Sequence, residues 1–204
     1  MNEKNIEKTL VIIKGDGVQR GIAGEILSRF ERVGLKFKAM KMVWPNENLV
    51  NRHYDANNTE WLENVGKKAI KGYEKRGVKI EKDPMEIGLA VQKNLLKYFS
   101  AGPVIAMVLE GAHAVEMVRK LVGPTDPFGA PPGTIRGDYS MDSFQMADEE
   151  NRTIRNLIHA SGSTEEAKKE IEIWFDPSEL YNYIMPIDEV LYSKGWEDKQ
   201  AVIE

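Results

Sequence analysis

A continuous apolar run at residues 103–109 restricts the fold more than any other feature of this sequence. The run is too short to cross a bilayer and does not alternate polar with apolar residues, so it predicts a central β-strand. Residues 9–13 form a second apolar run, which ends at a glycine-containing loop and predicts another buried strand. Residues 35–42 alternate apolar and basic side chains with period two, the pattern of a half-exposed strand. We therefore expect a sheet built around two buried strands.

Segments with helical periodicity follow or separate these strands. Residues 22–33 and 112–121 each place apolar side chains on one face, and each segment is followed by a glycine that ends the helix. Residues 48–100 are mostly helical by pattern, with breaks near residues 57–58 and 77–84. The order of strands and helices predicts an α+β sandwich in which helices cover one sheet.

The last third of the chain begins with a loop. Proline and glycine are so dense at residues 124–133 that regular structure is not expected there. Residues 153–159 predict the last strand. A helix over residues 164–175 should follow, because Ser163 and Glu166 have the spacing of a capping box. The length of 204 residues is equally compatible with one domain with insertions and with two small domains, and we expect one domain.

A histidine and a glutamate flank the start of this capped helix. Glu170 shares the apolar face of the helix with Ala167, Ile171 and Trp174. An inward carboxylate is costly unless something hydrogen-bonds it, and His159, just before the turn, is placed to be that partner. An imidazole oriented in this way is typical of a catalytic nucleophile.

The charge balance excludes several classes of partner. The formal net charge is −4 with a pI near 5.6, which argues against nucleic acid and anionic membranes as overall partners. Any phosphate site must therefore be a local cluster of cations. The chain has no cysteine, so disulfides and thiol nucleophiles are excluded. No segment has the apolar length of a signal peptide core or a membrane span, so a cytoplasmic protein is expected.

Three cations are candidates for such a cluster. Lys14 follows a buried strand and precedes glycines, so its ammonium can reach a phosphate, although a solvated lysine is also common there. Arg136 lies between glycines and could present its fork to phosphate oxygens or pair with Asp138. Arg119 could join them, or form a surface pair with Lys120.

The other histidines and the basic helix have simpler explanations. His53 lies in a polar helical stretch, for which solvent exposure is the simplest account. His113 follows a glycine and is interpreted as a residue at a helix start or on the surface. The lysines and arginine of residues 67–76 are interleaved with apolar residues, as on an amphipathic helix with a solvated face.

Taken together, these segments resemble the nucleoside diphosphate kinase family. The Gly-Thr-Ile-Arg-Gly-Asp loop at residues 133–138 and the Asn-x-x-His-x-Ser motif that begins at Asn156 are each specific to that family. The other matching segments occur in the family's order over most of the chain, at residues 9–14, 16–21, 53–54, 102–111 and 155–170.

The resemblance implies a fold, a reaction and a set of site residues. The fold would be a ferredoxin-like βαββαβ sandwich with a four-stranded antiparallel sheet. The reaction would move the γ-phosphoryl group of a nucleoside triphosphate to a nucleoside diphosphate by a ping-pong route through a phosphohistidine. His159 matches the nucleophile, and Ser161 and Glu170 match the residues that orient it. The nucleotide-contacting positions are matched by Lys14, Tyr54, Arg119, Thr125, Arg136 and Asn156.

The resemblance also suggests what accompanies the protein. Mg²⁺ is expected to arrive with the nucleotide rather than on dedicated protein ligands. A homo-oligomer is expected, often a hexamer, with a tetramer or dimer as alternatives.

The chain departs from the family pattern in several places. Insertions are expected at about residues 57–94 and 142–153 within a single domain of residues 1–204. Because the first insertion lengthens this segment, the residue that stacks on the base is not assigned from the family pattern, and Trp61 and Leu62 are candidates.

Single-residue departures are milder. Gly15 replaces a proline, which could loosen the loop beside Lys14. Ala160 and Gly162 replace a common glycine and a common aspartate beside the histidine.

Two other functions compete with catalysis. The insertions could have disabled turnover and left a nucleotide-binding regulatory module. The basic helix at residues 67–76 could bind nucleic acid with an affinity that falls steeply with salt, although the net negative charge argues against this as the main role.

Overall fold

The computed structural model of the protein describes residues 6–55 and 57–196 and centres on one antiparallel sheet. Its strands are β1 (Ile6–Ile13), β2 (Lys36–Val43), β3 (Val104–Ala112) and β4 (Ile158–Ala160), in the spatial order β2-β3-β1-β4. The two apolar runs form β1 and β3, the two central strands, as predicted. Residues 1–5, part of the charged N-terminal stretch that argues against a signal peptide, lie outside the described residues.

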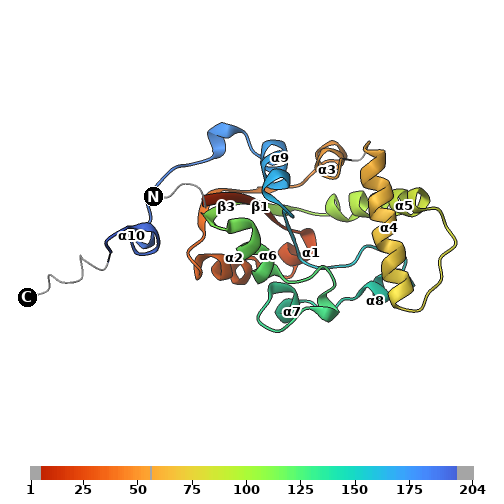
Figure 1. The fold of residues 1–204 in the computed structure, drawn as a ribbon. Helices are drawn as coiled ribbons and strands as arrows, with labels where there is room; N and C mark the ends of the chain where they lie inside the picture. The colour runs from red at the N-terminus through yellow and green to blue at the C-terminus, as the bar shows by residue number, and fades with distance from the viewer. Residues whose placement is uncertain (1–5, 56, 197–204) are drawn as a thin grey trace, which may run out of the picture.

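Helices cover both faces of this sheet (Figure 1). Alternate residues of β1 point to opposite faces: Val11 and Ile13 pack in one apolar cluster, whereas Leu10 and Ile12 pack in the other. The first cluster includes residues of α2 (Ala23–Glu31) and α6 (Ala114–Val122); the second includes residues of α3 (Glu47–His53), α5 (Pro84–Phe99) and α9 (Thr164–Trp174). The α+β class and the ferredoxin-like βαββαβ order are therefore confirmed.

The remaining helices lie between these elements or follow them. They are α1 (Gly15–Gln19), α4 (Thr59–Lys75), α7 (Ile135–Tyr139), α8 (Phe144–Glu149) and α10 (Pro186–Tyr192). Single 3-10 turns occur at Pro127–Gly129, inside the proline-rich loop, and at Pro177–Glu179. Among the described helices, none is at once long and apolar enough to span a membrane.

Two glycines let α4 and α5 cross with their backbones in contact. A Cβ at Gly66 would overlap the carbonyl oxygen of Pro84, and one at Gly88 would overlap that of Leu62. Caps set where the helices begin, since Asn58 accepts a hydrogen bond from the backbone of α4 and Asp83 from that of α5. Helices α4 and α5 therefore form a tightly packed helical hairpin.

The far end of this hairpin contacts the second expected insertion. The Tyr73 hydroxyl donates to Asp148 of α8 at 2.9 Å, and Arg76 forms an ion pair with the same carboxylate. The guanidinium of Arg76 also lies 5.8 Å from the ring centroid of Phe144. Two segments that are separate in sequence thus meet on one side of the molecule (Figure 1).

Strand β2 is at the edge of the sheet and does not expose its lysines as the period-two pattern suggests. An irregularity between Phe37 and Ala39 shifts the register, so Lys38 is buried and Met40 and Met42 are exposed. The C-terminal tail covers the first half of this edge. The Tyr181 backbone N–H donates to the Lys38 carbonyl at 2.8 Å.

The last strand is shorter than the predicted segment of residues 153–159. Only Ile158–Ala160 pair with β1, because Leu157 has a left-handed backbone with φ of 67° and cannot continue a ladder. The predicted capping box of α9 is half formed. Ser163 caps Glu166 N–H, but the Glu166 carboxylate accepts from Gly162 N–H instead of the cap residue.

Candidate active site

His159 lies on β4, opposite Ile12 of β1, and faces the helical layer that contains α3 and α9. Its Nε2 atom is 2.8 Å from Oε1 of Glu170. The contact is close but does not meet the geometry of a hydrogen bond, so His159 Nε2 has no hydrogen-bond partner among the described residues. Because Nε2 faces Glu170, Nδ1 is the ring nitrogen that does not contact this carboxylate.

Glu170 is buried on the apolar face of α9, as predicted, and polar groups hold it in place. Ser161 Oγ donates to Oε2 of Glu170 at 2.6 Å. Ser161 is itself fixed by the backbone N–H of Leu10, which donates to its hydroxyl at 3.2 Å. Burial raises the pKa of Glu170, whereas the Ser161 hydroxyl opposes this rise. The three predicted residues His159, Ser161 and Glu170 are thus brought together.

The prediction that His53 is exposed is wrong. The side chain is buried behind the nucleophile candidate, with its ring centroid 4.5 Å from that of His159 and an interplanar angle of 81°. Its Nδ1 accepts a hydrogen bond from Trp174 Nε1 at 3.2 Å and lies 3.5 Å from Glu170 Oε1. One signal could have placed it: Val50 and His53 are three residues apart, so they share the buried face of α3.

Both histidines are uncharged at neutral pH. Burial, and then the nearby Lys14, lowers the pKa of His159 to about 3. Burial and the neighbouring His159 lower the pKa of His53 to about 3 as well. A neutral imidazole keeps a lone pair on one ring nitrogen, which a nucleophile requires.

Lys14 is buried at the end of β1 and donates from Nζ to Asn156 Oδ1 at 2.7 Å. Asn156 in turn donates from Nδ2 to the Thr125 carbonyl at 2.9 Å. Burial, with a smaller effect of Arg136, lowers the pKa of Lys14 to about 7. Three predicted nucleotide contacts, Lys14, Thr125 and Asn156, are therefore linked in one chain of hydrogen bonds.

Arg136 does not pair with Asp138, which binds Arg29 instead. It is buried and donates to three backbone carbonyls, those of Asn156, Gly123 and Ile158, at 3.1, 2.9 and 2.7 Å. A guanidinium has five N–H donors, so two remain for a ligand. Burial and the charge of Arg119 lower the pKa of Arg136 to about 10, which leaves it cationic.

The remaining predicted contacts border the site. Arg119 is exposed on α6, close enough to lower the pKa of His159. Tyr54 follows His53 and is half-buried, with its ring centroid 6.0 Å from that of Trp61. Of the two candidates for base stacking, Leu62 is buried in the crossing of α4 with α5, so Trp61 is the more accessible.

Residue-by-residue reasoning missed Asp16. Its Oδ2 accepts from the backbone N–H of Leu157 at 3.1 Å, and the Leu157 carbonyl accepts from Lys14 N–H at 2.8 Å. These two bonds hold Leu157 in its left-handed conformation, between Asn156 and the strand that carries His159. One signal could have identified it, because Asp16 lies between two glycines directly after Lys14.

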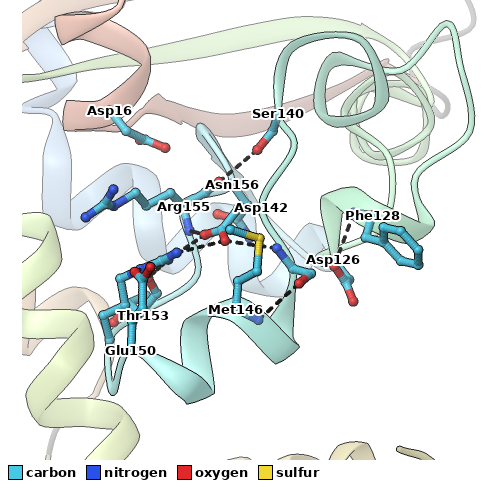
Figure 2. A network of polar contacts seen from close by, with 12 residues as sticks. Asp16, Asp126, Phe128, Ser140, Asp142, Met146, Glu150, Thr153, Arg155 and Asn156 are labelled. Atoms are coloured by element: carbon cyan, nitrogen blue, oxygen red, sulfur yellow. Dashed lines mark hydrogen bonds and ion pairs between the residues drawn. The ribbon is translucent and has the colours of Figure 1, made fainter.

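The carboxylate of Asp142, in the second expected insertion, fixes the backbone just before Asn156 (Figure 2). Asp142 accepts from Arg152 through both oxygens, at 2.6 and 2.9 Å, and from the Arg155 backbone N–H at 2.6 Å. Ser140 Oγ donates to the Arg155 carbonyl at 2.9 Å. The residue before Asn156 is therefore held on both its N–H and its carbonyl.

One group of side chains in the described part of the chain has metal-ligand spacing. A donor atom from each of His53, His159 and Glu170 lies within 4.8 Å of the others. These atoms already engage Trp174, Ser161 or one another, and two of the three donors are nitrogen, whereas Mg²⁺ prefers oxygen. The group therefore fits an oriented imidazole better than a magnesium site.

A neutral, oriented histidine beside fixed cations on an α+β sandwich defines a phosphotransferase. The family model for nucleoside diphosphate kinase matches residues 7–80 and 87–180. The chain belongs to the nucleoside diphosphate kinase family, whose members transfer the terminal phosphate of a nucleoside triphosphate to a nucleoside diphosphate.

Relatives and solved structures agree with this membership. The nucleoside diphosphate kinase of Pyrobaculum aerophilum is 51% identical over 180 residues, which cover 86% of this chain and 98% of the relative. A crystal structure of an NDP kinase from the same organism has a TM-score of 0.82 at 49% identity, covering 87% of this chain and all of that one. A transition state mimic of the Borrelia burgdorferi enzyme, with bound vanadate and ADP, has a TM-score of 0.75 at 39% identity and covers 92% and 98% of the two chains.

Proposed function

We propose that His159 takes the γ-phosphoryl group of a nucleoside triphosphate on Nδ1 and passes it to a nucleoside diphosphate. The observation that carries this proposal is the 2.8 Å contact between His159 Nε2 and buried Glu170. The carboxylate holds the imidazole in the tautomer with a proton on Nε2, so the Nδ1 lone pair is available. Glu170 and Ser161 act as positioning residues and do not touch the transferred group.

The surrounding residues supply positioning and positive charge, the main needs of phosphoryl transfer. Arg119, Thr125 and Arg136 would hold the phosphates, while Lys14 and Asn156 would meet the ribose hydroxyl and the transferred group. Tyr54 would border the nucleotide. The vanadate and ADP bound to the Borrelia burgdorferi relative support a site of this kind.

Magnesium would enter with the nucleotide and neutralise charge on its phosphates. Lys14 and Arg136 are cations and cannot be oxygen ligands of the metal. This agrees with a Mg²⁺ ion that is held by the nucleotide phosphates.

The assembly and the boundaries are also proposals. A homo-oligomer is supported by Met40, Met42 and Trp44, apolar residues exposed on or just after edge strand β2. We further propose a single domain over residues 1–204 in which residues 57–94 and 142–153 are insertions. A cytoplasmic location stays a prediction.

Labelling tests the role of His159. The protein is incubated with γ-labelled ATP, quenched at alkaline pH and searched for an acid-labile label on His159. We expect stoichiometric label in the wild type and essentially no label or transfer in His159→Ala. His113→Ala is the matched control, because His113 is exposed at the start of α6. A folded wild type without label, or an active His159→Ala, would reject the proposal.

A further inference from the structure

Two histidines face one carboxylate oxygen in the site. Glu170 Oε1 lies 2.8 Å from His159 Nε2 and 3.5 Å from His53 Nδ1. A carboxylate binds a charged imidazolium more strongly than a neutral imidazole. If His53 carried a proton on Nδ1, it would therefore compete with His159 for Glu170, and His159 would lose its orienting partner.

Trp174 forms a hydrogen bond with Nδ1 of His53, the atom through which His53 would compete for Glu170. The indole N–H can only donate, so the 3.2 Å hydrogen bond from Trp174 Nε1 requires a lone pair on His53 Nδ1. In the neutral ring the proton then lies on Nε2. That nitrogen is buried without a hydrogen-bond partner among the described residues. The sequence spacing supports the arrangement, since Trp174 and Glu170 lie one turn apart on α9.

The charged and titratable groups around His53 come from three elements. Glu170 comes from α9, His159 from β4 and Lys14 from the end of β1. Tyr54, next to His53 on the chain, packs edge-on at 4.7 Å. Lys14 and His159 disfavour a charge on His53, whereas Glu170 favours it. Glu170 is therefore the group that would draw a proton onto His53 if its Nδ1 were free.

We propose that Trp174 and His53 are positioning residues that reserve Glu170 for His159. The indole donor fixes His53 as the neutral Nε2–H tautomer, so His53 packs behind the nucleophile without binding its carboxylate. This inference rests on the proposed role of His159. Removing the indole N–H would free Nδ1 to take a proton from solvent as the pH falls, and the resulting imidazolium would pair with Glu170.

The test compares pH profiles of kcat at saturating nucleotide. Trp174→Phe removes the donor and keeps an aromatic ring. We expect its activity near pH 8 to stay within about threefold of wild type, and its acid limb to move up by about one pH unit. At a pH below the midpoint of that limb, the shift corresponds to a further loss of up to about tenfold. Trp44→Phe is the matched control, since the exposed Trp44 donates its indole N–H to a backbone carbonyl, that of Ser100, and not to a histidine.

A second variant identifies the group that titrates. In Trp174→Phe combined with His53→Asn, no imidazole is left to take the proton, so the acid limb should return to the wild-type position even if the plateau is lower. A Trp174→Phe profile of unchanged shape would overturn the proposal. So would a shifted limb that persists in the double variant.

Histidine ¹⁵N chemical shifts of the wild-type protein give a measurement that needs no variant. His53 should show a protonated Nε2 and an unprotonated Nδ1 from pH 5 to 8, and the opposite tautomer or a charged ring would contradict the proposal. Failure of the proposed function is recognised separately, because it would leave His159 unlabelled by γ-labelled ATP in the wild type.

Discussion

At the scale of single residues, the site combines uncharged imidazoles with cations that are themselves buried. Lys14 shows the consequence most directly. Its ammonium has left water for a place between Asn156 and the rings of Tyr98 and Phe99, which lie 5.3 and 5.6 Å away. Its charge is therefore poorly stabilised until an anion arrives.

Nucleotide binding should consequently take up a proton. With a pKa of about 7, most free Lys14 is neutral at pH 8, and a bound phosphate would raise its pKa and recharge it. Calorimetry at pH 8 in buffers of different ionisation enthalpy should report uptake of up to about one proton per nucleotide. Lys14→Met should lose this uptake and bind more weakly, whereas exposed Lys97→Met on α5 should keep both. Equal heats in all buffers would contradict the prediction.

Glu170 should affect turnover through the orientation of His159. Glu170→Ala is expected to lower kcat by about 10–1000-fold, because the imidazole loses its partner while the nucleophile remains. The KM should change little if the carboxylate does not touch the nucleotide. Glu172→Ala, an exposed change on the same helix, is the control. Wild-type turnover in Glu170→Ala would remove the residue from the mechanism.

The sequence revealed Glu170 but not the position of His53, and the reason is physical. Glu170 is a carboxylate on the same helix face as the apolar residues Ala167, Ile171 and Trp174, so the helical periodicity of the sequence identifies it as unusual. His53 is a polar residue in a polar stretch of a short helix, where a buried face and an exposed face look alike. The spacing of three residues from Val50 was the one local signal of its burial, whereas its contacts with Trp174 of α9 and His159 of β4 depend on the tertiary structure.

At the scale of elements, capping side chains determine where the helices begin, and close backbone contact determines how α4 packs on α5. The caps Asn58, Asp83 and Ser163 can be read from sequence. The short helices α7 and α8 cannot, because five or six residues are too few for a periodic signal. The last strand was predicted too long because Leu157 is apolar, yet its backbone turns away from the sheet.

Two glycines of α4 should respond oppositely to alanine. Gly66→Ala places a Cβ on the Pro84 carbonyl and must push the helices apart, at a cost of about 2 kcal/mol or more in the free energy of unfolding. Gly72→Ala meets only the flexible end of Arg76 and should stabilise by about 0.5–1 kcal/mol. Urea denaturation measures both. Equal effects of the two substitutions would show that the crossing is looser than described.

At the scale of the whole molecule, the sheet has one edge that the tail covers only in part. Lys36 pairs with Asp188 at 2.6 Å and the tail backbone bonds to Lys38, but Met42, further along β2, is 61% exposed. An exposed apolar sheet edge is a frequent site of association. The contact between the end of α4 and α8 could not be predicted, because the four side chains that form it come from separate segments and leave no periodic pattern.

A charge on this edge should weaken self-association. If copies of the chain associate through β2, Met42→Lys should shift the sedimentation velocity distribution towards smaller species, because a lysine at the edge opposes pairing of strands. Met141→Lys is the matched control, since Met141 is 92% exposed in the loop between α7 and α8. An unaltered distribution for Met42→Lys would place the interface elsewhere.

The length of α4 fixes a dimension of the molecule. At its start Trp61 adjoins Tyr54, and at its end Tyr73 and Arg76 hold Asp148. A helix of 17 residues spans about 25 Å and changes length only in steps of about 1.5 Å per residue, each with a rotation of about 100°. Deleting one residue would turn one of these contacts away from its partner. The helix thus fixes the distance between its two contacts, and changes in the length of α4 should be tolerated only in whole turns.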